Sequence, residues 1–498
     1  MKGRRNRLVF GIAIGLLSVV VLLFVLVLVV PDRMLKSNYI RSQIGGDPES
    51  GILDYDSASS KWPGTIHVKN LRFRDRDPKA EWAWELSEAD LTYSLVDLLQ
   101  RRFHVTRATG RGLVFHARNR LTRAEATAAV LRRIPPIAGF PDPPLLYPPA
   151  PKPPPTGKLW DILVENLEVD SVREIWIDGY RYVGDARLTG GFFLRPKERA
   201  EVFPATLRTR TGMIRSGNQV LADDLTAKLE ARFPSWDVQQ LRGNRVLRIV
   251  SGKAELSARL STAELLDRLL GEPPGTKLEK GSGRMNVRAT VESGVAQGDI
   301  DYASRDLALR FLDVAMRGRF DGRMRLSGVR IENWGGGRLD AGHVRLAGAT
   351  VVDRKGRSHP WWGRMDFARG EFRPKSEALF TTTAAVHARN AVPLLQVVRV
   401  NPPAWTQKLL DLDDALEARA SIRIGRALVE VRRLSAHTGK LQIDGEYRAK
   451  GRSTNGTFLL DAGLLSVGAG ISEGTPSVRI FGPRKWFRER TGWDPPKN

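Results

Sequence analysis

The sequence predicts a mainly β protein in which a single N-terminal transmembrane helix precedes an elongated antiparallel β-sheet with a few short helices. Three observations predict this class. One long uncharged apolar run lies near the N-terminus, apolar and polar residues alternate through most of the remaining chain, and glycine-containing breaks separate the alternating segments. Alternation with a period of two is typical of antiparallel strands that have one apolar and one solvated face.

The apolar run covers residues 8–30 and carries no charge. A helix of this length spans about 34 Å, which is enough for a bilayer core with some tilt. Basic residues precede the run, namely Lys2, Arg4, Arg5 and Arg7. The positive-inside rule therefore predicts a cytoplasmic N-terminus and export of the rest of the chain. A cleaved signal peptide is the alternative, but its core is shorter and ends at a small-residue cleavage site, whereas here Pro31 follows. No second run is long enough to cross, so a single-pass topology is expected.

The composition limits the chemistry and the partners of the exported part. The chain has no cysteine, which excludes disulfides, thiolate catalysis and cysteine-based metal sites. Its formal net charge of +24 favours anionic partners. An exported protein meets lipid head groups and glycans rather than DNA, so we expect no nucleic-acid partner. Solvation and the protection of strand edges by charge explain the same basic composition without any ligand.

The alternating segments continue from about residue 65 to 482. In the segment 285–291, for example, Met285, Val287, Ala289 and Val291 alternate with polar residues. Three later segments supply the candidate apolar face of the sheet, which consists of Leu307, Leu309, Phe311, Met324, Leu326, Val344 and Leu346. A sandwich core would give the same alternation, so the pattern does not separate an open sheet from a closed one.

Helices are expected to be short: 95–99, 122–133, 263–270, and a helical break within 391–412. Between residues 135 and 155 lie eleven prolines, a density that neither a helix nor a sheet tolerates. This Pro-rich segment is predicted to be a linker or a surface excursion. The expected organisation is therefore a basic N-terminus and transmembrane helix (1–30), an N-terminal β/α region (31–134), the Pro-rich segment (135–158) and a β-rich body (159–498).

No motif for catalysis or for a cofactor is found. The chain lacks a phosphate-binding loop, a G-x-S-x-G nucleophile elbow and an H-E-x-x-H metal motif. Its seven histidines are scattered. We therefore expect no enzyme activity, no catalytic residue, no metal site and no cofactor.

The order of the N-terminal segments resembles that of a known family. After the transmembrane run come an extended block (60–71), a Ser-capped turn (94–99), a strand (103–108) and a turn into a further strand (112–115). Over residues 1–120 this order is similar to that of the AsmA-like family of Gram-negative envelope proteins, the group of the TamB relatives. The rest of the chain is similar only in its general β-rich character, and the Pro-rich segment departs from the family pattern.

The resemblance implies an inner-membrane anchor and a periplasmic body formed by a curved, taco-like open sheet with an apolar groove. It also implies a role in phospholipid transport or outer-membrane biogenesis, with phospholipid or an anionic glycan as ligand and an envelope protein as partner. The candidate apolar face would then line the groove. One alternative is a periplasmic scaffold with a closed sandwich that binds protein or peptidoglycan, and a further one is an envelope-glycan enzyme on a β fold. A continuous apolar groove, a dry core or a polar cleft with carboxylates would distinguish the three.

Overall fold

The computed structural model describes residues 52–495 with gaps, the longer of which are 147–160, 263–275, 333–335, 353–357, 374–378 and 391–413. Three predicted features lie outside the described residues: the transmembrane run 8–30, the helix 263–270 and the helical break 391–412. Among the residues that the structure describes, no helix is long and apolar enough to span a bilayer.

The prediction of a mainly β protein is confirmed, because 23 strands are assigned to one sheet. The chain divides into two compact units near Ala258, so the Pro-rich segment falls within the range of the first unit. The strands of unit 1 are β1 (Ile52–Asp54), β2 (Ser57–Trp62), β3 (Thr65–Arg76), β4 (Ala80–Tyr93), β5 (Arg102–Asn119), β6 (Asp161–Ile177), β7 (Tyr180–Arg195), β8 (Arg199–Ser216), β9 (Gln219–Asp237) and most of β10 (Ser251–Leu260), with a 3-10 helix η1 (Gly243–Arg248).

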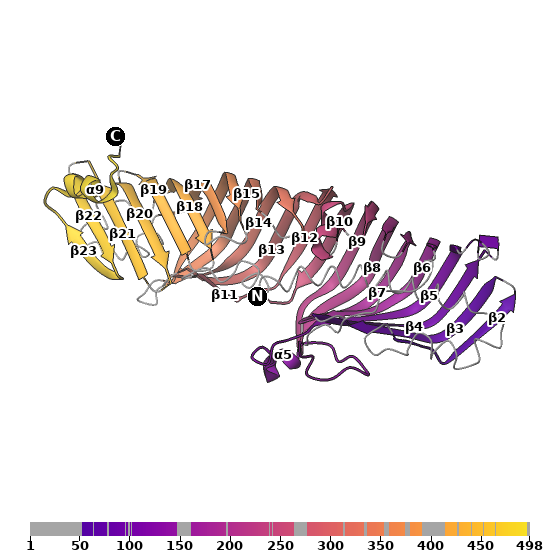
Figure 1. Cartoon of the computed structure of the whole chain (residues 1–498). Helices are drawn as coiled ribbons and strands as arrows, with labels where there is room; N and C mark the ends of the chain where they lie inside the picture. Colours follow the sequence, from indigo (N-terminus) through magenta and orange to yellow (C-terminus); the bar gives the residue numbers. More distant parts are fainter. Residues whose placement is uncertain are drawn as a thin grey trace. The chain divides into compact units, whose positions relative to one another are not determined.

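The strands of unit 2 are β11 (Thr276–Lys280), most of β12 (Gly283–Glu292), β13 (Val295–Phe311), β14 (Val314–Arg330), β15 (Gly337–Val352), β16 (Ser358–Phe372), β17 (Phe380–Ala388), β18 (Leu416–Gly425), β19 (Leu428–Thr438), β20 (Leu441–Lys450), β21 (Ser453–Asp461), β22 (Ser466–Ser472) and β23 (Thr475–Arg479). From β13 onward each strand pairs antiparallel with the next one along the chain. A helix, α9 (Pro483–Thr491), follows β23 and lies against β21 and β22 (Figure 1).

One pairing in unit 1 is parallel, between β5 and β6. A parallel neighbour requires a crossover connection rather than a hairpin, and residues 120–160 provide it. This connection includes the Pro-rich segment, whose described residues pack back on unit 1. Ile137 is buried, and the Leu121 and Leu145 backbones form an isolated parallel bridge. Helix α5 (Ala128–Leu131) is the only helical turn of the predicted helix 122–133 in this structure.

Three residues with positive φ lie opposite one another on strands of unit 1. Asn70 (φ 49°), Gly112 (φ 69°) and Ser171 (φ 62°) occupy one row across β3, β5 and β6, with Ser87 of β4 between the first two. Left-handed residues inside a strand increase its twist and bend it locally. Strands β4 to β8 curve along their length (Figure 1).

Aromatic side chains cover glycines on neighbouring strands in both units. A Cβ atom added to Gly212 would collide with the ring of Tyr182, and one added to Gly445 would collide with the ring of Phe458. Covering a strand glycine with an aromatic ring restores apolar burial where the glycine has no side chain. These glycines are therefore needed to seat the rings.

Candidate functional site on the inner face of the sheet

Six of the seven residues of the candidate apolar face lie on one side of β13, β14 and β15, which we call the inner face of unit 2. The register pairs Leu309 with Met316 and Met324 with Gly342, which places these residues on one side. The same register puts Leu307, Leu326, Val344 and Leu346 on that side as well. Leu307 and Leu346 are buried, whereas Leu309, Met324, Leu326 and Val344 are half-buried. The backbone of Phe311 pairs with Val314, and its side chain lies outside the described residues.

A bulge in β13 determines which residues belong to this face. Ser304 pairs with Phe320 and Leu307 pairs with Gly318, so β13 has one extra residue between these two pairs. The bulge reverses the alternation, and Tyr302 and Leu307 therefore share the inner face although one number is even and the other odd. The apolar inner face then continues across β17 to β22 in a buried cluster that includes Ala384, Ile422, Ile443 and Phe458.

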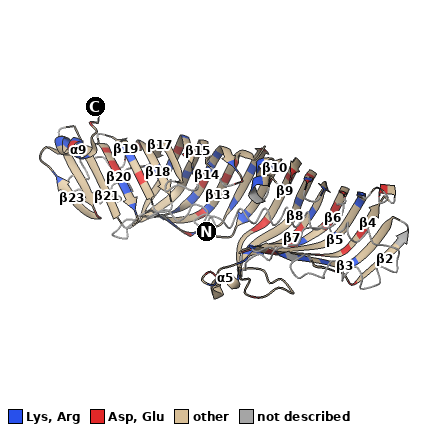
Figure 2. Ribbon diagram, viewed as in Figure 1, with Lys and Arg blue, Asp and Glu red and all other residues tan. Residues whose placement is uncertain are grey.

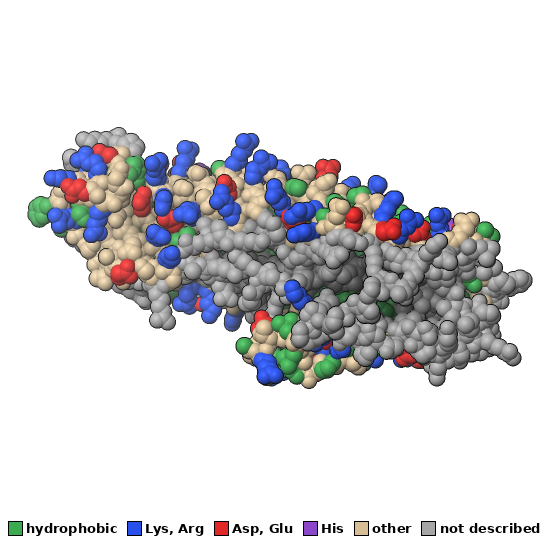
Figure 3. Space-filling view, viewed as in Figure 1, with side chains coloured by type: hydrophobic (Ala, Val, Ile, Leu, Met, Phe, Trp, Pro, Cys, Tyr) green, Lys and Arg blue, Asp and Glu red, His purple; other side chains and the backbone are tan. Residues whose placement is uncertain are grey.

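The opposite, outer face of these strands carries charge. Arg325 donates to Asp299 at 3.0 Å, and Arg317 makes two hydrogen bonds of 2.6 Å to Asp306. Burial alone would raise the pKa of Asp299, but the hydrogen bond and charge of Arg325 outweigh it and lower that pKa. Lys and Arg alternate with other residues along the strands (Figure 2) and gather on the visible surface of unit 2 (Figure 3). Unit 2 therefore presents one apolar and one cationic face.

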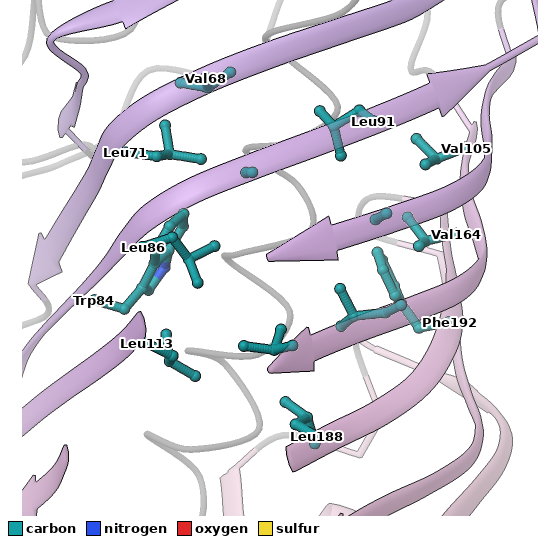
Figure 4. Packing of buried hydrophobic residues seen from close by; sticks show 14 of the residues in the cluster. Val68, Leu71, Trp84, Leu86, Leu91, Val105, Leu113, Val164, Leu188 and Phe192 are labelled. Atoms are coloured by element: carbon teal, nitrogen blue, oxygen red, sulfur yellow. The ribbon is translucent and has the colours of Figure 1, made fainter. Parts of the chain in front are cut away.

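Unit 1 has an inner face of the same kind, which the sequence prediction did not select. Its buried cluster takes residues from β2 to β8, in register across the strands. One row consists of Leu71, Leu86, Leu113, Val172 and Ala186. Figure 4 shows Leu86, Leu91 and Phe192 within this packed layer. The alternation in 66–73 and 161–169 marks these strands in the sequence, but only the pairing shows that they share a face.

Aromatic residues with polar atoms occupy one end of the inner face of unit 1. The ring of Trp84 stacks on Phe73 with 5.8 Å between centroids, and Trp82 lies two residues earlier on the same face of β4. Both tryptophans are buried, with exposed fractions of 2% and 4%. Tyr182, in register with the same row, donates to the Thr211 carbonyl at 3.4 Å, and burial raises its pKa. None of these residues belongs to the apolar face predicted from the sequence.

A buried ionic cluster lies on the outer face at this same end of the strands. The carboxylate of Glu81 accepts hydrogen bonds of 2.8 Å from both Arg118 and Arg120. Arg118 also donates to the Pro135 and Pro141 carbonyls and pairs with Asp142. The side chains of Glu81 and Arg118 are fully buried. The cluster thus fixes the crossover connection to the sheet, which is a structural role.

Within the described part of the chain, no group of histidine and carboxylate side chains could hold a metal ion. Comparisons with family models, curated proteins and solved structures found no match for this chain. The chemistry that the inner faces offer is burial of an apolar ligand, because their side chains are overwhelmingly hydrocarbon.

Proposed function

We propose that this chain is a non-enzymatic, inner-membrane-anchored periplasmic protein of the AsmA-like type, and that it binds phospholipid acyl chains on the inner faces of its sheet. Its role would be phospholipid transport or outer-membrane biogenesis. The observation that carries the proposal is the continuous apolar inner face within each unit, set against a charged outer face. The uncharged run 8–30 and the basic residues before it support the anchor and its orientation.

The energetics favour an acyl ligand. Each methylene group removed from water contributes about 0.8 kcal/mol, so binding strengthens with the length of acyl chain that the inner face shelters. In unit 2 the half-buried Leu309, Met324 and Val344 have apolar surface still available for such contact. An apolar face left partly exposed is otherwise a liability for a periplasmic protein.

The cationic outer face supports a contact with anionic head groups or glycans. Arg317, Arg323 and Arg325 project from β14 on the side opposite Met324, and each also pairs with a nearby aspartate. The excess of Lys and Arg in the whole chain leaves a net positive field after such pairing.

The alternative, a periplasmic scaffold that binds protein, has one observation in its favour. Strand β23 pairs with β22, and all five of its residues are exposed. Val478 and Phe481 present apolar surface there, with exposed fractions of 63% and 87%. Edge strands with apolar side chains are suited to pairing with a strand from another protein.

A pulse–chase measurement of phospholipid movement tests the transport role. The gene would be deleted in the source bacterium, and labelled phospholipid in the inner and outer membranes would be followed after complementation. We expect the wild-type chain to restore transfer and the variant Leu309→Asp/Met324→Asp/Val344→Asp to fail, because three carboxylates would cross the inner face. The matched control is Ala303→Gln/Ala315→Gln/Ala341→Gln, which changes outer positions of β13, β14 and β15 without altering their charge. Restoration by the aspartate variant, at equal protein level, would contradict the proposal.

A further inference from the structure

We infer that Trp82 and Trp84 form a polar subsite that binds the ester carbonyl oxygens of a diacyl glycerophospholipid. This inference rests on the proposed function and specifies the chemical class of its ligand. Within the part of the chain that the structure describes, both indole Nε1–H groups are buried and have no hydrogen-bond partner. Indole nitrogen only donates, so each of these groups requires an acceptor.

Two unpaired donors at successive same-face positions of one strand are costly for a folded protein. Leaving a buried donor without an acceptor costs about 1–3 kcal/mol, and most buried polar groups are therefore paired. Trp82 and Trp84 point to the same face because they are two residues apart on β4. Two buried indole N–H groups without an acceptor, at neighbouring positions of one face, therefore indicate a site where a ligand supplies the acceptor.

The surroundings specify what kind of acceptor fits. On one side of Trp84 the inner face is hydrocarbon from Leu86 to Leu91, and it continues onto Val105, Val164 and Phe192 (Figure 4). From Leu86 to Tyr93 this region extends over about 24 Å of strand contour, at 3.4 Å per residue. The ligand must therefore combine long hydrocarbon with acceptor oxygens at one end. Acyl esters have this composition, and their carbonyl oxygens accept but do not donate.

The subsite also orients the ligand along the strands. Hydrocarbon would lie on the rows of Leu86 and Leu91, and the ester oxygens would lie at the Trp82 end. Phe73 stacks on Trp84 and Tyr182 shares its row, so the ester region would be bordered by aromatic rings. Tryptophan and tyrosine take the same position at the boundary between hydrocarbon and polar groups in membranes.

A competition experiment with ester and ether lipids tests the subsite. A fluorescent phospholipid bound to the purified full chain would be displaced by diester or by diether phosphatidylglycerol with identical chains. The ether lipid has no carbonyl oxygen and so cannot accept from the indoles. We expect the wild type to bind the diester about 5- to 25-fold more tightly, which corresponds to one or two hydrogen bonds.

The variant Trp82→Phe/Trp84→Phe retains the rings but removes both donors. We expect it to bind the diether as the wild type does and to lose the preference for the diester. Trp362→Phe, at a half-exposed position of unit 2, is the control and should retain the preference. Equal binding of both lipids to the wild type, or a preference that survives in the double variant, would overturn the subsite while leaving acyl binding intact. Displacement by neither lipid would instead refute the proposed function.

Discussion

Replacing Glu81 by glutamine should destabilise unit 1 strongly. The Glu81 carboxylate is fully buried and accepts 2.8 Å hydrogen bonds from the guanidinium groups of Arg118 and Arg120. Glutamine is almost the same size but removes the negative charge, which leaves two buried cations without their shared partner. Breaking a buried ion pair in this way costs about 3–5 kcal/mol. That loss is a large part of the stability of an ordinary domain, which is about 5–15 kcal/mol.

Pulse proteolysis of the full chain in a urea series would measure this change. The matched control is Glu85→Gln, which makes the same chemical change four residues along β4 at an exposed position. We expect the control to unfold within about 0.5 kcal/mol of the wild type. We also expect Glu81→Gln to expose the connection 120–146 to protease first, since Arg118 ties Pro135 and Pro141 to the sheet. Equal unfolding midpoints for the two variants would refute the argument that this cluster stabilises the fold.

Three further changes test other parts of the structure. Gly445→Ala should lower the free energy of unfolding by about 1–3 kcal/mol, because the new Cβ meets the buried Phe458 ring. Gly179→Ala, which has open space around it, should leave this free energy nearly unchanged in the same urea titration. Burial raises the pKa of Asp444 above its unfolded value, so the contribution of Asp444 to stability falls as pH rises from about 4 through the folded pKa. Asp444→Asn should remove that fall. A variant with the same dependence of stability on pH as the wild type would refute this prediction. The hydrogen bond from Arg195 lowers the pKa of Asp161, so the contribution of Asp161 to stability is present above about pH 4 and is lost as pH falls through the folded pKa. Asp161→Asn should therefore be less stable than the wild type at pH 7, and the difference should vanish as pH falls through the folded pKa.

The strands could be predicted from the sequence because each one has one apolar and one solvated side. In such a sheet, successive residues lie on opposite faces, so the apolar Met324 and Leu326 mark the inner face and Arg325 marks the outer one. The six described side chains of the candidate apolar face share one side because their segments pair as near neighbours along the chain. Whether this face receives lipid stays a prediction.

Other features depend on long-range pairing that no local pattern encodes. The parallel pairing of β5 with β6 depends on the path of residues 120–160. The proline density predicts that part of this segment lies outside the sheet, but it does not predict which strands the segment connects. The bulge between Ser304 and Leu307 reverses the alternation of apolar and polar residues along β13. In the sequence it is marked only by the two exposed polar residues Arg305 and Asp306, a pattern that an exposed turn would also give. Glu81 and Arg118 are 37 residues apart, so their burial together could be seen only in the structure.

The central claim is that acyl chains lie on the inner face, and a crosslinking footprint in living cells tests it most directly. A benzophenone amino acid would replace, one at a time, the inner residues Leu309, Met324 and Val344 and their outer neighbours Arg310, Arg325 and Arg345 in the full chain. Phospholipid adducts would then be quantified by mass spectrometry after illumination. We predict adducts to the acyl chains at the three inner positions and few acyl-chain adducts at the three outer ones, so that the yield alternates from one residue to the next along each strand. Equal yields at both sets, or no adduct at the inner positions of a folded protein, would contradict this prediction.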